Sequence, residues 1–242
     1  MWGCFLLWTA IGSVVMPLGI GEGQVVRSLP DGFARRLVLA VLPVSDALWI
    51  ALAAVLTYLY TASSEGLATA RRWTLLILLG SGAAEWIGAQ TGFPFGPYRY
   101  TERFGWRIGG VLPVAIPLSW MVILLCGRTV VLSLRPAGTR LQTALGTAVV
   151  AVLTDFNLEF VAWKVRGYWI WYPDASGLVP TWPPAQNFLA WFVLSFALVL
   201  ALPPCYDLRP RRPSPFRPIA TLVLMNGLFV LVYTARLLRI SG

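Results

Sequence analysis

The sequence predicts an all-α membrane protein, a polytopic transmembrane helical bundle of about seven helices. Hydrophobic residues make up 57 % of its 242 positions and charged residues only 12 %, unlike the composition of a soluble domain. The apolar residues also form runs of roughly 20 positions with almost no charge, which as helices are long enough to cross a hydrocarbon core of about 30 Å. Composition and run length together therefore predict membrane spans.

The predicted spans follow one another along the whole chain. They lie near Trp2 to Ile20, Leu37 to Tyr60, Trp73 to Ala89, Ile108 to Leu134, Leu141 to Trp163, Ala185 to Leu202 and Ile219 to Leu238. The first run lacks the basic start and small-residue cleavage site of a signal peptide, so we expect it to be retained. No repeat or low-complexity tract divides the chain. We expect residues 1–242 to form a single, multi-pass domain of the cell (plasma) membrane.

The formal net charge of +9 does not indicate nucleic-acid binding. Arginines flank the spans in ones and twos, as at Arg35, Arg36, Arg71 and Arg72, instead of gathering on one surface. Basic residues in such positions anchor helices among lipid headgroups, so lipid and not nucleic acid is the expected partner. Lysine and arginine divide almost evenly between the two sides, which leaves the orientation open.

The residue inventory limits the possible chemistry. Histidine is absent, which removes the usual general base and the usual ligand of haem and non-haem iron. Cys4, Cys126 and Cys205 show no CxxC spacing, so neither a disulfide framework nor a zinc site is predicted. We expect no metal and no other cofactor. Catalysis would then rest on carboxylates, hydroxyls or aromatic rings.

Four carboxylates lie well inside the predicted spans: Asp46, Glu85, Asp155 and Glu159. An ionisable group at the centre of a membrane helix costs about 2.5 to 3.5 kcal/mol, so each is a functional candidate. Counted at about 1.5 Å per residue, all four lie in the same half of the bilayer. Asp155 and Glu159 are four residues apart and share a helix face, with Asn157 turned away from it. Three helices can therefore bring carboxylates towards one cavity.

An alternative is that these acids clamp helices together. Each would then pair with a base in the adjoining loops, namely Arg99, Arg103, Lys164 or Arg166. This interpretation explains a single acid better than it explains all four, because one or two ion pairs between helices would not require so many acids.

Two loops predicted on one side of the membrane, Gln90 to Arg107 and Lys164 to Pro184, are crowded with Gly, Pro, Trp and Tyr. An ordinary aromatic belt would enrich both interfaces equally. The asymmetry favours a ring-lined pocket beneath these loops, because aromatic faces attract cations.

Glycine and proline spacing adds two local expectations. Gly88, Gly92 and Gly96 recur every four residues, which predicts close helix packing or a tight loop. Pro113 and Pro117 predict a kink in the fourth span.

Two long stretches combine acids with glycine, proline and aromatic motifs in a fixed order. Glu85 to Trp120 contains an acid, spaced glycines, FGPYRY and a proline-containing span, and Asp155 to Trp191 contains TDFNLE, GYWIWY and PAQNFLAWF. This ordered set resembles the CruF-type carotenoid hydratases, a carotenoid biosynthesis membrane family that includes bisanhydrobacterioruberin hydratase. The sequence departs from the pattern at Phe160 and Ala190, where the resemblance leads us to expect proline and glycine.

The resemblance implies a cofactor-independent enzyme, a carotenoid 1,2-hydratase (hydro-lyase). It would add water to the terminal C=C bond of an acyclic carotenoid end group and give a tertiary alcohol. The residues are compatible with this chemistry, because burial favours the neutral carboxyl group that can protonate an alkene. Aromatic faces could shield the resulting cation, and a second carboxylate could orient and deprotonate the attacking water.

Candidate roles follow from the resemblance and the positions of the acids. Asp155 is the predicted proton donor, with Glu85 or Glu159 positioning water and Asp46 as a further catalytic candidate. The predicted substrate-binding residues are Trp86, Tyr98, Tyr100, Trp120, Asn157, Trp169, Trp171, Asn187 and Trp191. The expected partners are an acyclic carotenoid, water and membrane lipid, while the oligomeric state is left open.

Other classes fit less well. Among membrane isoprenoid-modifying enzymes such as prenyltransferases and cyclases, a prenyltransferase would use paired acidic clusters for magnesium diphosphate, and Asp155 with Glu159 supplies at most one. A proton-coupled transporter would use buried acids as a relay, but here the acids gather in one half of the bilayer. A retinal-binding protein would need a lysine in a late span, and the sole lysine, Lys164, ends the fifth.

Overall fold

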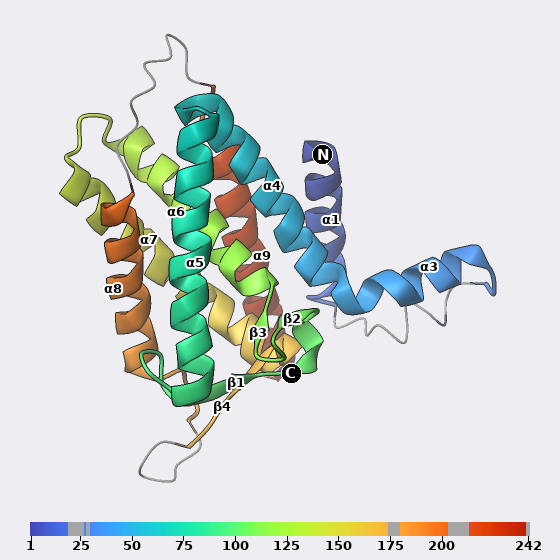
Figure 1. The fold of residues 1–242 in the computed structure, drawn as a ribbon. Helices are drawn as coiled ribbons and strands as arrows, with labels where there is room; N and C mark the ends of the chain where they lie inside the picture. Colours follow the sequence, from blue (N-terminus) through green and yellow to red (C-terminus); the bar gives the residue numbers. More distant parts are fainter. Residues whose placement is uncertain (19–26, 28–29, 174–179, 203–212, 241–242) are drawn as a thin grey trace.

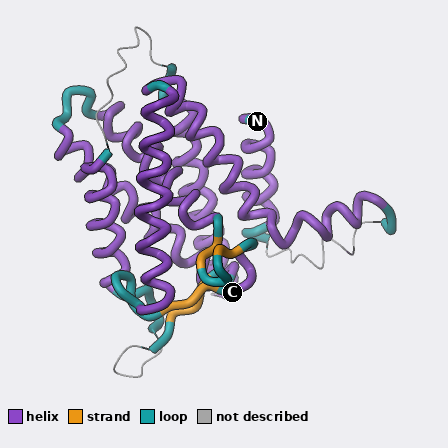
Figure 2. The backbone as a smooth tube through the Cα atoms, in the orientation of Figure 1, coloured by secondary structure: helices purple, strands orange, loops and turns teal. Residues whose placement is uncertain are grey.

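The computed structural model describes residues 1–18, 27, 30–173, 180–202 and 213–240, which form a helical bundle with short strands at one end (Figures 1 and 2). The helices are α1 (Trp2–Val15), α3 (Phe33–Val41), α4 (Ser45–Glu65), α5 (Leu67–Thr91), α6 (Ala115–Leu134), α7 (Arg140–Glu159), a π-helical segment (Phe160–Arg166), α8 (Ala185–Ala201) and α9 (Phe216–Ile240). The strands are β1 (Tyr98–Tyr100), β2 (Arg107–Ile108), β3 (Leu112–Pro113) and β4 (Trp169–Trp171). The end of the first predicted span, at Ile20, and Cys205 lie outside the described residues.

The surface of the bundle is suited to lipid. In the described part of the chain, four helical stretches are long and apolar enough to cross a membrane, and α1 and α8 are shorter apolar helices. Large apolar side chains face outwards at helical spacing, as at Leu145, Val149 and Leu153 of α7. Water disfavours such a continuous apolar stripe, whereas lipid accommodates it. The predicted all-α membrane bundle is confirmed.

Helix α6 forms the centre of the bundle and packs against α4, α5, α7 and α9 (Figure 1). Almost every side chain from Ala115 to Gly127 is buried. A helix that is apolar on all sides belongs in the interior, where neighbouring helices cover it. The N-terminal end of α6 lies beside the strands, and this end of the bundle holds the candidate site.

The second predicted span is broken near its start. Helix α3 ends at Val41, a short 3-10 turn contains Pro43, and α4 begins at Ser45. Proline lacks an N–H and has a fixed φ, which suits the first turn of a helix but not its interior. Asp46 therefore lies in the first turn of α4 and not about ten residues inside a helix, as the sequence had suggested.

The fourth predicted span begins later than expected. Strands β2 and β3 form a small hairpin, and α6 begins only at Ala115. Pro113 ends the hairpin, while Pro117 lies in the first turn of α6, where backbone N–H groups have no helical partner in any case. Helix α6 runs unbroken to Leu134, so the predicted proline kink is wrong.

A tight turn after α5 leads the chain back to the candidate site. Gly92 and Gly96 have φ values of 78° and 111°, a region that side chains rarely adopt. Gly88 lies against Phe95, since a Cβ on Gly88 would be 2.6 Å from a carbon of that ring. The glycine spacing therefore serves the tight loop that the sequence predicted.

Candidate active site

Strands β1 and β4 join the two aromatic loops as an antiparallel ribbon at one end of the helices (Figure 2). Tyr98 lies opposite Trp171, and Tyr100 lies opposite Trp169. Side chains alternate between the faces of a strand, so these four rings share one buried face while the residue between each pair is exposed. The ribbon thereby directs two phenols and two indoles at the carboxylates of α5 and α7.

Glu85 of α5 accepts three hydrogen bonds. The hydroxyls of Tyr98 and Tyr100 each donate to Oε2 at 2.7 Å, and Trp120 Nε1 donates to Oε1 at 2.8 Å. Burial, reinforced by the nearby Glu85 charge, raises the pKa of both tyrosines well above the ordinary value. The phenols therefore keep their protons and act as donors. Hydrogen bonds from three donors favour the ionised form of this carboxyl group, whereas its burial favours the neutral form.

Asp155 and Glu159 of α7 share one amide group. Asn187 Nδ2 lies 2.8 Å from Asp155 Oδ2 and 3.2 Å from Glu159 Oε1. Glu159 Oε2 also accepts from Trp169 Nε1 at 3.1 Å and from Trp171 Nε1 at 3.3 Å. The common bond to Asn187 is consistent with the predicted shared helix face. Two buried carboxyl groups at such close range favour holding a proton between them, because like charges repel.

The three acids line one cavity of about 750 Å³. The predicted residues that also line it are Tyr98, Tyr100, Trp120, Trp169, Trp171, Asn187 and Trp191. Trp120 and Trp191 stack with ring centroids 3.8 Å apart. Within the described ranges, no lysine or arginine nitrogen lies within 4.0 Å of Glu85, Asp155 or Glu159. The clamp interpretation therefore does not fit these three acids.

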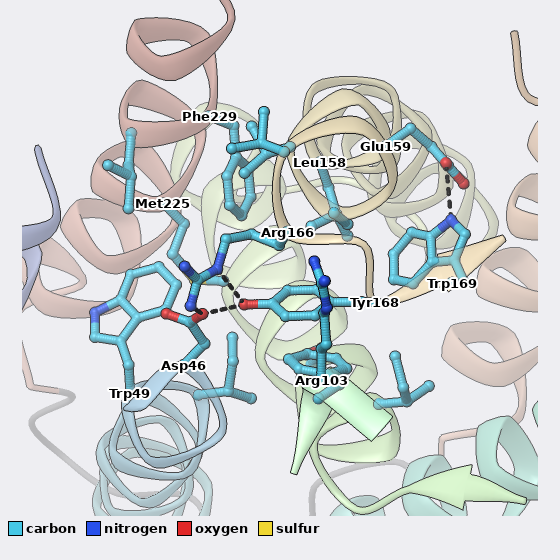
Figure 3. Close-up of a pocket in the computed structure, with 18 of the residues that line it drawn as sticks. Asp46, Trp49, Arg103, Leu158, Glu159, Arg166, Tyr168, Trp169, Met225 and Phe229 are labelled. Atoms are coloured by element: carbon cyan, nitrogen blue, oxygen red, sulfur yellow. Dashed lines mark hydrogen bonds and ion pairs between the residues drawn. The ribbon is translucent and has the colours of Figure 1, made fainter. Parts of the chain in front are cut away.

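Asp46 lines the same cavity but has a different environment (Figure 3). Its Oδ2 accepts hydrogen bonds from the Arg166 guanidinium and the Tyr168 hydroxyl. Arg166 Nε also donates to the Tyr168 oxygen at 3.1 Å. Figure 3 shows this cluster on one side of the cavity and Glu159 with Trp169 on the other. Asp46 thus links α4 to the π-helical segment, as the clamp interpretation predicts for this residue.

Two predicted substrate-binding residues point elsewhere. The Trp86 ring covers the turn between β2 and β3, where a Cβ on Gly109 would be 2.4 Å from it. Asn157 donates through Nδ2 to Asn226 Oδ1 of α9 at 2.9 Å. Neither side chain lines the cavity.

Sequence reasoning missed six aromatic residues that line the cavity: Trp8, Trp49, Phe95, Phe104, Tyr168 and Phe229. Phe95 and Tyr168 belong to motifs that had already been noted, the FGPYRY and GYWIWY segments. Their positions next to the predicted rings were the available signal.

The acids do not form a recognisable metal site. In the part of the chain that the structure describes, no group of three or more His, Cys, Asp or Glu side chains could hold a metal ion. The arrangement instead offers carboxyl groups in two different settings: Glu85 is surrounded by donors, and Asp155 and Glu159 form a pair. Such a division suits acid–base chemistry inside an apolar cavity.

The fold and the site define a helical membrane protein with a buried cavity lined by carboxylates and aromatic rings. Residues 45–240 match the family described as carotenoid biosynthesis protein, and the chain belongs to that family. It is similar to bisanhydrobacterioruberin hydratase of Haloarcula japonica, with 30 % identity over 160 residues, or 62 % of this chain and 52 % of the relative. The chain thus matches about half the length of that curated relative. No solved structure matches.

Proposed function

We propose that the protein is a multi-pass plasma-membrane enzyme that hydrates the terminal C=C bond of an acyclic carotenoid, without a cofactor. The observation that carries this proposal is the convergence of Glu85, Asp155 and Glu159 on one cavity lined by aromatic rings, with no basic partner among the described residues. The family and the name of the relative support a carotenoid as substrate.

In this proposal Asp155 carries the shared proton. Among the described residues it accepts one hydrogen bond, from Asn187, whereas Glu159 accepts three. The less solvated member of a carboxyl pair holds the proton more readily. Transfer of that proton to the terminal double bond forms a C–H bond and leaves a positive charge on the tertiary carbon.

The cation requires negative charge that does not itself react. Glu85 is suited to this role, because the donors on both of its oxygens favour its ionised form. A fixed charge in a site with little water stabilises a developing cation strongly. The faces of the surrounding tryptophan and tyrosine rings add to this stabilisation.

Water then completes the reaction. Its oxygen bonds to the tertiary carbon, and its surplus proton passes to Glu159, whose bonds of 3.1 to 3.3 Å are longer than those to Glu85. Movement of this proton back to Asp155 restores the pair. The net change is the addition of one water molecule, with no oxidation or reduction.

Expression in a host that accumulates lycopene or another acyclic carotenoid tests this function. We expect pigments heavier by one or two waters with an unchanged absorption spectrum, because the terminal double bond lies outside the conjugated chain. Liquid chromatography with mass spectrometry gives the result. Unaltered pigments from several acyclic substrates, with folded protein present, would contradict the proposal. A product of unchanged mass but different retention time would instead indicate a cyclase, which shares the protonation step.

A further inference from the structure

The cavity extends well beyond the acids. Its lining also includes apolar residues of α1 and α9, two helices that pack against each other. These apolar residues are Ile11, Gly12 and Val15 of α1, Met16 directly after it, and Met225, Leu228 and Phe229 of α9, while the charged Arg236 of α9 also lines the cavity. Ile11 is 54 % exposed, so the cavity reaches the outer surface of the bundle here. An apolar opening on the outer face of a membrane bundle faces lipid.

Only the first half of α1 is anchored to the bundle by buried side chains in the described structure. Phe5 is fully buried and stacks on Trp49 with centroids 5.7 Å apart, and Trp49 Nε1 donates to Thr9 Oγ1 at 3.0 Å. After Thr9 no residue of α1 is buried. The second half of the helix therefore serves as a wall of the cavity and not as core.

The length of the substrate requires such an opening. A carotenoid is about as long as the hydrocarbon core is thick, roughly 30 Å. A cavity of about 750 Å³ is of the size that encloses a drug-sized ligand. When one end of the polyene reaches Asp155, the rest must extend along the cavity and leave it through an apolar passage.

We infer that the gap between α1 and α9 is the entry for the polyene, and that Gly12 is a specificity-determining position within it. This inference rests on the proposed function. Helix α1 precedes the family match, which begins at residue 45, so this wall belongs to a part of the chain that the match does not describe. A Cβ on Gly12 would lie 3.7 Å from Leu228 Cδ2, an ordinary contact distance. A larger side chain at this position would cross the gap to α9.

Gly12→Phe tests the inference, with Gly3→Phe as a matched control. Gly3 lies on the same helix but is exposed, and a Cβ there would meet nothing within 4 Å. The two readouts are hydration kinetics and the amount of carotenoid that co-purifies with the protein. The kinetics compare a carotenoid with a short acyclic isoprenoid that carries the same terminal alkene.

We expect Gly12→Phe to lower kcat/KM for the carotenoid about tenfold or more relative to the short isoprenoid, since a change of side-chain volume in an apolar site has effects of this size. Bound carotenoid should also fall, and Gly3→Phe should change neither ratio. Equal effects on both substrates, or carotenoid retention equal to that of the control, would overturn the inference. If Gly12→Phe does not fold, Val15→Phe replaces it, because Val15 lines the cavity from the same helix and a larger side chain there also narrows the opening. The same criteria apply to this variant. If the wild-type protein retains carotenoid but hydrates neither substrate, this result contradicts the proposed function and not the inferred entry.

Discussion

Asp155→Asn is expected to remove nearly all hydration activity while leaving the protein folded. Asparagine has the size of aspartate, and its side-chain oxygen can accept the hydrogen bond that Asn187 now donates at 2.8 Å. The substitution removes the transferable proton from the predicted donor. General acid catalysis contributes about 100-fold to 10,000-fold, and an isolated alkene has no easier route to its cation, so a loss in this range is expected.

The experiment combines hydrated-pigment yield with the melting temperature in detergent. Asp31→Asn is the matched control, because it makes the same change at a side chain that is 89 % exposed. If Asp155 were instead an ionised residue paired with a base, the substitution would leave the buried charge of that base without a partner. The unpaired charge would lower the free energy of unfolding by about 3 to 5 kcal/mol. Normal yield at normal stability would remove Asp155 from the mechanism. If Glu159→Gln alone abolished the yield, the donor role would pass to Glu159.

The convergence of the acids could be predicted because it depends on helical periodicity. Glu85 and Asp155 lie at matching depth in long apolar helices, and the spacing of Asp155 and Glu159 fixes a common face. The structure places all three at one cavity. Depth and face follow from counting residues, so they need no knowledge of how the helices pack.

The β1–β4 ribbon could not be predicted in the same way. Its strands are three residues long and lie about 70 residues apart, and alternation over three positions resembles an ordinary interfacial belt. The segments YRY and WIW carried the period of two, but pairing them required the fold. Asp46 was misplaced for a related reason, since a hydropathy pattern continues through the break at Pro43.

Glu85→Gln is expected to destabilise the protein as well as inactivate it, in contrast to Asp155→Asn. Glutamine offers one acceptor oxygen and one NH₂ group, whereas Tyr98, Tyr100 and Trp120 present three donors. If the amide oxygen accepts from Trp120, both phenols lose the acceptor they share. Hydrogen bonds to a charged group are each worth about 1.5 to 3 kcal/mol, so we expect the free energy of unfolding to fall by about 3 kcal/mol.

A second substitution determines whether the loss of stability in Glu85→Gln arises because three donors compete for one acceptor oxygen. Tyr98→Phe removes one of the three donors, so the double variant Glu85→Gln/Tyr98→Phe should be less destabilised than the sum of the two single changes. Thermal unfolding in detergent measures all four proteins of this cycle, with Glu102→Gln as the control, because the Glu102 side chain is 87 % exposed. Additive effects, or an unchanged melting temperature for Glu85→Gln, would show that Glu85 is held as a neutral acid. In that case Glu85, and not Asp155, would be the better candidate for the proton donor, because a neutral carboxyl group among these rings already carries the proton that the alkene needs.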